Sequence, residues 1–227
     1  MKVILITHGM EVGDYMQVII MAGGKYKDFE KHKALSFVRG EFLIERTIRL
    51  LKENGIKNWF ISSNDEAFEK YGIVLHHNNN YEAEKGVIKG YWVDAFYPTN
   101  EPTIYLHGDV YYTDDAMRKI LTLNPTVNTL IGNEIARNPQ HIDMGEPFGW
   151  IIVDQKSFRE AIEKTKKLQD EKKLNRGFAI SWELYRVMNG LDPNRMFIID
   201  ETYLSINDKT IDVDTPEQID MVNKGLR

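Results

Sequence analysis

The sequence has 227 residues, of which 42% are hydrophobic and 28% are charged, and its formal net charge is −5 at pH 7. These values are typical of a globular protein with a sizeable core, and they exclude a fibrous or disordered chain. No long basic segment with interleaved aromatic residues is present, so we expect no nucleic acid partner.

The chain contains no cysteine, which excludes disulfides, a thiol nucleophile and a thiolate metal site. No apolar run approaches the roughly 20 residues that a membrane span needs. The apolar run at residues 3–6 is also too short for the core of a signal peptide. We therefore expect a cytoplasmic protein without a membrane partner, and a homodimer is compatible with the sequence.

Short β-branched runs bounded by turn residues predict buried strands in the first half of the chain. Two such runs, at residues 1–6 and 16–21, open the sequence. Residues 1–15 are interpreted as an extra strand, an upstream start or a leader. Helical spacing of Ile44, Ile48 and Leu51 predicts a helix over 41–54. The remaining predictions for this half are strands at 59–61, 73–75 and 103–106 and helices at 66–71, 84–96 and 114–123.

The second half alternates less regularly between strands and helices. Strands are predicted at 127–132, 148–153, 196–199 and 210–213, and helices at 156–168, at 178–189 and after residue 214. The βα alternation predicts a Rossmann-like three-layer α/β/α fold with a mostly parallel mixed sheet. We expect residues 16–227 to form one domain, with a nucleotide-binding half over about 16–125 and an acceptor-binding half over about 126–227.

A glycine-rich turn, residues 22–25 (AGGK), directly follows the predicted strand at 16–21. Backbone N–H groups in such a turn can bind phosphate oxygens, and nearby lysines can meet further phosphates. The segment matches neither the P-loop nor the dinucleotide-binding pattern. A simple turn is an equally good interpretation of the glycines alone.

Two acidic positions are candidates for a metal site. Asp109 follows the predicted strand at 103–106, at the sheet edge where α/β proteins bind ligands, and carboxylates suit hard cations. It could equally cap the following turn, and His107 beside it is interpreted as a packed residue. Near the end of the chain, DVDTPEQ places Asp214 at a helix start. Because Asp212 and Asp214 alternate along a predicted strand, only one of them is expected to face a shared site.

These motifs, together with "GEFLIERTIRLLKENGI" and "YLHGDV", resemble the GT-A-like nucleotidyltransferases over about residues 16–222. That family includes MobA-like guanylyltransferases, cytidylyltransferases of sugar and alcohol phosphates, and sugar-1-phosphate nucleotidyltransferases. The resemblance implies an Mg²⁺-dependent enzyme that transfers a nucleoside monophosphate from an NTP to a small phosphorylated acceptor.

The resemblance also implies roles for particular residues. Lys33, which precedes Ala-Leu, would neutralise phosphate charge, and Asp109 and Asp214 would hold Mg²⁺. The predicted nucleotide contacts are Ala22, Gly23, Gly24, Lys25, Asn78 and Asn80.

The chain departs from the family pattern at two places. Many members have an arginine after the glycines, where this chain offers Lys25 and Lys27, and a proline before the family lysine, where it has His32. We expect Lys25 or Lys27 to replace the arginine, which weakens bidentate phosphate contact but keeps the positive charge.

The sequence says less about how the acceptor is bound. Trp150, Arg176, Trp182 and Glu183 are predicted to line the acceptor pocket, and helix packing is an equally good interpretation of Trp182. The short chain slightly favours CTP as the donor. Two alternatives stay open: a GT-A glycosyltransferase, which normally carries Asp-x-Asp where this chain has Asp109-Val110-Tyr111, and an inactive nucleotide-binding module.

Overall fold

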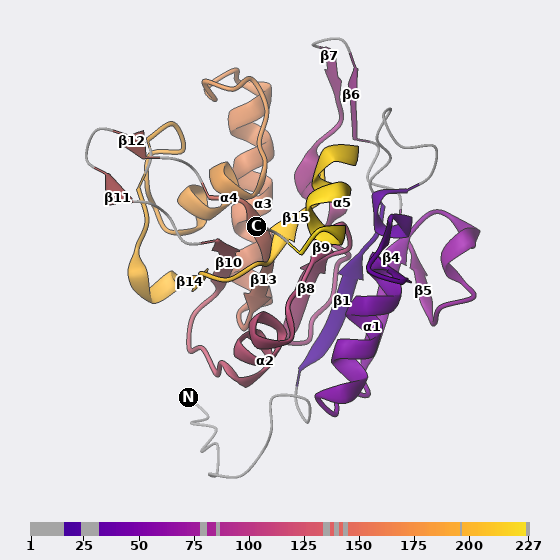
Figure 1. Cartoon of the computed structure of the whole chain (residues 1–227). Coiled ribbons are helices and arrows are strands. Elements are labelled where there is room, and N and C mark those ends of the chain that lie inside the picture. Colours follow the sequence, from indigo (N-terminus) through magenta and orange to yellow (C-terminus); the bar gives the residue numbers. More distant parts are fainter. Residues whose placement is uncertain are drawn as a thin grey trace.

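Figure 1 shows the computed structural model of the chain. It describes residues 16–23, 32–77, 81–84, 87–133, 137–138, 141–142, 145–195 and 197–225. The predictions made for residues 1–15 lie outside the described residues.

A seven-stranded sheet forms the centre of the molecule. Its strands, in spatial order, are Tyr203–Ile206 (β14), Thr129–Asn133 (β10), Pro147–Ile152 (β13), Thr103–His107 (β8), Gln17–Met21 (β1), Trp59–Ser63 (β4) and Val74–His76 (β5). Only β13 runs antiparallel to its two neighbours, β8 and β10, while the other neighbouring pairs are parallel. The predicted mostly parallel mixed sheet is therefore confirmed.

Helices cover both faces of this sheet, because successive side chains of a buried strand point to opposite sides. In β1, Val18 and Ile20 pack in the core formed with Leu43–Glu53 (α1) and Asp114–Thr122 (α2). Ile19 packs on the other face, in the core formed with Gln155–Asp170 (α3) and Ser181–Met188 (α4). The three-layer α/β/α architecture follows from this arrangement.

Short ladders and one further helix complete the fold. Val110–Tyr111 (β9) pairs with Ile211–Asp212 (β15), and Phe37–Val38 (β2) pairs with Glu41–Phe42 (β3). The last helix is Pro216–Asn223 (α5). Two further hairpins join Glu82–Glu84 (β6) to Val87–Lys89 (β7) and Arg137–Asn138 (β11) to His141–Ile142 (β12).

Two predicted elements are wrong. The helix predicted over 84–96 is replaced by β7 and a 3-10 helix at Trp92–Ala95, which are separated by Gly90 with a φ of 72°. A left-handed glycine ends regular structure, so the helical spacing of apolar residues here does not produce a helix. The strand predicted at 196–199 does not form there, and the strand of this region is β14, at Tyr203–Ile206. The side chains of Leu204 and Ile206 pack in the α1/α2 core.

Two boundaries also shift. The helix predicted at 66–71 shortens to a 3-10 helix at Glu66–Phe68. The last helix is capped by Thr215, so Asp214 lies just outside it.

None of the helices in the described part of the chain combines the length and apolar character that crossing a bilayer requires.

Candidate active site

The site begins where β1 and β8 end side by side. The backbone N–H of Gly108 donates to the carbonyl oxygen of Met21 at 2.9 Å, and a Cβ at position 108 would lie 2.7 Å from that oxygen. Only glycine permits this approach. Gly108 thus places the next residue, Asp109, beside the turn that starts at Ala22.

The β9–β15 ladder brings the end of the chain to the same place. Asp212 pairs with Val110, and the N–H of Val213 donates to the carbonyl oxygen of Asp109 at 3.0 Å. In Figure 1, β15 and α5 (yellow) lie beside β9. Two segments that are far apart in the sequence therefore meet at one edge of the sheet.

Three carboxylates converge at this edge. One oxygen from each of Asp109, Asp212 and Asp214 lies within 4.8 Å of the others. The expectation that only one of Asp212 and Asp214 can face the site is wrong, because β15 ends at Asp212. Asp214 lies in the turn before α5, where the alternation of a strand no longer applies.

Lys33 lies among these carboxylates, at the start of a 3-10 helix, Lys33–Leu35. Its Nζ is 2.8 Å from Asp109 Oδ2 and 2.5 Å from Asp214 Oδ1. Burial lowers the pKa of Lys33, but the charges of Asp109 and Asp212 and hydrogen bonds to Asp109 and Asp214 outweigh it, so the pKa is raised overall. Lys33 therefore carries its positive charge throughout the physiological range.

The two acids that Lys33 contacts remain open to solvent. The side chain of Asp109 is 24% exposed and that of Asp214 is 49% exposed. A ligand can therefore reach both carboxylates from outside.

Asp212 differs from its two neighbours. Burial raises its pKa well above the usual value, with the negative charge of Asp109 adding to the effect and Lys33 opposing it. Its Oδ1 is buried and has no hydrogen-bond partner in the described part of the chain. A buried acceptor without a donor is costly, so this oxygen is one that a cation would satisfy.

Glu146 is a fourth carboxylate near this centre that the sequence did not single out. Burial raises its pKa, and the charge of Asp214 acts in the same direction. Its backbone is fixed by Asn133, whose Oδ1 accepts the Glu146 N–H at 2.8 Å and whose N–H donates to the Glu146 carbonyl at 3.0 Å. It lies beside a register shift in the pairing of β10 with β13, between Ile131 and Gly132, which no local sequence pattern reveals.

The first part of the predicted phosphate turn lies beside Asp109. The N–H of Ala22 donates to Ser62 O at 2.9 Å, and Ala22 O accepts from Ser63 Oγ at 3.2 Å. A Cβ at Gly23 would meet none of the described residues within 4 Å. The other predicted nucleotide contacts, Gly24, Lys25, Asn78 and Asn80, lie outside the described residues, as does Lys27.

Both histidines near the site are packed. The ring of His107 lies 6.0 Å from that of Trp92, and burial lowers the pKa of His107, which favours the neutral imidazole. This agrees with its interpretation as a packed residue. His32, at the family proline position, has its Nε2 2.7 Å from Asp65 Oδ2 and its ring edge-on to Phe68.

Trp150 and Trp182 do not line an acceptor pocket; their exposed fractions are 0% and 2%. The Trp150 Nε1–H donates to Ser181 Oγ at 3.3 Å, and the Trp182 Nε1–H donates to Gly145 O at 2.9 Å. The expectation that these rings meet the acceptor is corrected, because both are satisfied core residues. The packing alternative holds for Trp182.

Glu183 is also a structural residue. Its carboxylate accepts the N–H of Ile180 at 3.0 Å and so caps α4. Arg176 lies 3.8 Å from Glu183, and its side chain is 36% exposed. Of the four predicted acceptor contacts, Arg176 is therefore the one whose side chain can meet a ligand.

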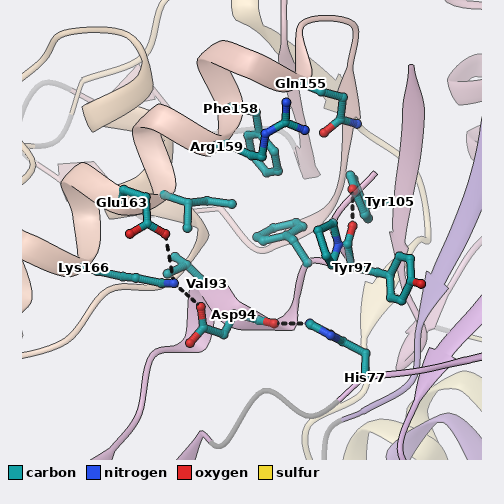
Figure 2. Close-up of a pocket in the computed structure, with 13 residues that line it drawn as sticks. His77, Val93, Asp94, Tyr97, Tyr105, Gln155, Phe158, Arg159, Glu163 and Lys166 are labelled. Carbon is teal, nitrogen blue, oxygen red and sulfur yellow. Dashed lines mark hydrogen bonds and ion pairs between the residues drawn. The ribbon is translucent and has the colours of Figure 1, made fainter. Parts of the chain in front are cut away.

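A separate cavity lies on the other face of the sheet, between α3 and residues 93–98. Its volume is about 320 Å³, and its lining includes none of the three aspartates. The walls are mainly apolar, with Phe96, Phe158 and Ile162 among them. Figure 2 shows Lys166 at one end, between Asp94 and Glu163.

The family model of the MobA-like NTP transferase domain matches residues 18–179. A curated relative, the "Bifunctional IPC transferase and DIPP synthase" of Thermococcus kodakarensis, is 25% identical over 227 residues. The match covers 92% of this chain and 50% of the relative, so the chain spans about half the length of that protein.

Solved structures share the fold. The CTP:phosphocholine cytidylyltransferase of Streptococcus pneumoniae has a TM-score of 0.54 at 15% identity, covering 94% of this chain and 100% of that chain. The inositol-1-phosphate CTP transferase of T. maritima has a TM-score of 0.53 at 14% identity, covering 94% of this chain and 98% of that chain. Identities this low establish the common fold alone.

Proposed function

Because this chain belongs to the MobA-like NTP transferase domain family of nucleotidyltransferases, we propose that it transfers CMP from CTP to the phosphate of a small alcohol or sugar and releases pyrophosphate. The observation that carries this proposal is the convergence of three aspartates and Lys33 on one edge of the sheet, beside the turn that starts at Ala22. This arrangement would supply both a cation site and a positive charge for phosphates.

The residues present fit Mg²⁺. Carboxylate oxygens are its preferred protein ligands, and Asp109, Asp212 and Asp214 offer three that lie within 4.8 Å of one another. The buried Oδ1 of Asp212, which has no partner among the described residues, is the kind of acceptor that a cation satisfies. When bound, Mg²⁺ would neutralise phosphate charge and polarise the phosphorus that is attacked.

The chain itself would position the substrates. The N–H groups of the glycine turn can hold phosphate oxygens, and the Lys33 ammonium can neutralise them. The acceptor's phosphate is already ionised near pH 7, so its oxygen can attack the α-phosphorus in line without a protein base. Catalysis then depends on positioning and charge, which is consistent with the neutral, packed His107.

The choice of CTP and of an alcohol phosphate is supported by the names of the relatives. Two structural neighbours are named as a CTP:phosphocholine cytidylyltransferase and an inositol-1-phosphate CTP transferase. Among the predicted acceptor contacts, Arg176 alone keeps a partly exposed cationic side chain that could meet an acceptor's phosphate.

The test is a pyrophosphate-release screen that crosses the four NTPs with sugar, polyol and amino-alcohol phosphates, with Mg²⁺ or EDTA. We expect release with CTP and one class of acceptor, and only with the cation. Hydrolysis of a nucleotide sugar without pyrophosphate release would instead indicate a glycosyltransferase. NTP binding without turnover over the whole panel would indicate an inactive module.

Replacing Asp109 by Asn tests the metal role. The variant should fold but lose activity by about 100-fold or more, which corresponds to roughly 3 kcal/mol of transition-state stabilisation. Asp170→Asn, which removes an exposed carboxylate on α3, is the control and should retain activity. Full activity of Asp109→Asn would refute the assignment.

A further inference from the structure

The position of Lys33 conflicts with a cation bound by the aspartates. Its ammonium lies 2.8 Å from a carboxylate oxygen of Asp109 and 2.5 Å from one of Asp214, so it stands between the two groups. An ion that coordinates both carboxylates, with bonds of about 2.1 Å for Mg²⁺, must also lie between them. The ammonium and the ion therefore compete for one gap.

The side chain of Lys33 is well placed to hold this gap. It is 11% exposed, and it enters from a 3-10 helix whose residue Ala34 is packed in the α1/α2 core. Lysine nevertheless has a long flexible stem and three rotatable N–H donors, so the ammonium can exchange one anion for another while its backbone stays fixed. The turn at Ala22 and Gly23, where phosphates would bind, lies beside Asp109.

We propose that Lys33 is the resident counter-ion of the gap between Asp109 and Asp214 in the nucleotide-free protein, and that a divalent cation binds there only after the ammonium has moved to another anion. This inference rests on the proposed function, in which the triphosphate supplies that anion. Nucleotide and metal then bind cooperatively, because the triphosphate removes the competitor of the ion. The free protein binds the ion weakly.

The probe is Mn²⁺ alone, with free Mn²⁺ counted by electron paramagnetic resonance in the absence of nucleotide. Lys33→Met should bind Mn²⁺ about tenfold or more tightly than the unaltered protein, because the competing charge has gone. Lys33→Arg keeps the charge and should bind as weakly as the unaltered protein. Lys33→Gln, also uncharged, provides a second variant if the methionine protein does not fold.

The matched control is Lys166→Met. Lys166 also bridges two carboxylates, with its Nζ 2.5 Å from Asp94 Oδ1 and 3.1 Å from Glu163 Oε1 (Figure 2). Lys166→Met removes one positive charge, as Lys33→Met does, but at a place distant from the aspartate cluster. Its Mn²⁺ affinity should match that of the unaltered protein, which separates a local counter-ion from a change in overall charge.

A second readout is the shift in melting temperature on adding Mn²⁺, since a ligand stabilises the folded state more as its free concentration rises relative to its dissociation constant. The shift should be larger for Lys33→Met than for the unaltered protein. Equal or weaker binding by the uncharged variants, or no Mn²⁺ binding by any protein, would overturn the inference.

The proposed activity is judged separately, by pyrophosphate release from the unaltered protein. An active enzyme whose Lys33 variants bind Mn²⁺ no more tightly would refute the counter-ion role alone. An inactive protein whose uncharged variants bind more tightly would support the counter-ion role and reject the activity.

Discussion

At the scale of the residue, Asp212 lowers the stability of the free protein and offers an oxygen that a cation could bind. Its carboxylate is held in a buried position where its pKa is raised well above the usual value, first by burial and then by the charge of Asp109. Its Oδ1 has no hydrogen-bond partner in the described part of the chain. Such a group destabilises the free protein, and natural proteins tolerate this where function needs it.

Asp212→Asn should therefore stabilise the metal-free protein at neutral pH by on the order of 1 kcal/mol, because the amide imitates the neutral acid without burying a charge. The raised pKa of Asp212 means that the folded state favours the proton. The free energy of unfolding that Asp212 contributes through this proton is full below about pH 4, the pKa of an aspartate in the unfolded chain. It is lost as the pH rises toward the raised pKa of Asp212 in the folded protein.

The advantage of Asp212→Asn should thus grow between about pH 4.5 and pH 7.5. Urea unfolding in EDTA at both pH values measures it, and Asp220→Asn, in α5, is the control. The same variant should lose Mg²⁺-dependent activity. An unfolding free energy below that of the unaltered protein at pH 7.5 would contradict the prediction.

At the scale of the element, the start of α5 fixes Asp214. The Thr215 side chain accepts the N–H of Gln218, and the Gln218 Oε1 accepts the N–H groups of Asp214 and Thr215 at 2.6 and 2.8 Å. Reciprocal capping of this kind stabilises a helix start. Here it also holds the backbone of a candidate metal ligand.

Thr215→Ala should cost about 1 kcal/mol of stability, the usual value for a lost N-cap, and should also weaken Mn²⁺ binding. Thr113→Ala is the matched comparison, because the Thr113 Oγ1 accepts the N–H of Ala116 and caps α2. It should lose similar stability with little effect on Mn²⁺. Equal effects of both variants on Mn²⁺ binding would show that the α5 cap has no special role in the site.

Elements with strong local signals were predictable from the sequence. The spacing of Ile44, Ile48 and Leu51 predicts α1, and the β-branched run before Ala22 predicts β1, as the structure confirms. The region around Gly90 was not predictable, since its apolar spacing also fits a helix. The sequence also could not predict that Asp212 and Asp214 both face the site. Their orientation depends on where β15 ends, and the pairing of β15 with β9 fixes that end.

At the scale of the whole molecule, the two halves of the chain share one sheet. Strands β10, β13 and β14 from the second half continue the sheet beyond β8, and β13 pairs with β8 along Thr103 to Leu106. The final strand β15 returns to β9 in the first half. Neither half therefore closes its own core.

We expect one cooperative unfolding transition, because removing either half exposes the pairing edge of the other. Urea unfolding followed by circular dichroism should coincide with unfolding followed by tryptophan fluorescence. The Trp59→Phe/Trp92→Phe protein keeps the buried Trp150 and Trp182 as its fluorescent probes. Its fluorescence midpoint should equal the midpoint of its own circular dichroism. Two separated transitions would show that the halves unfold independently.

The pairing of β9 with β15 also affects how the protein is made. Asp109 leaves the ribosome long before Asp212 and Asp214, which follow it by roughly a hundred residues. At about 5–20 residues per second of synthesis, a nascent chain spends several seconds with Asp109 made and the other two aspartates of the cluster missing. The aspartate cluster therefore forms only after the segment that carries Asp212 and Asp214 has been made.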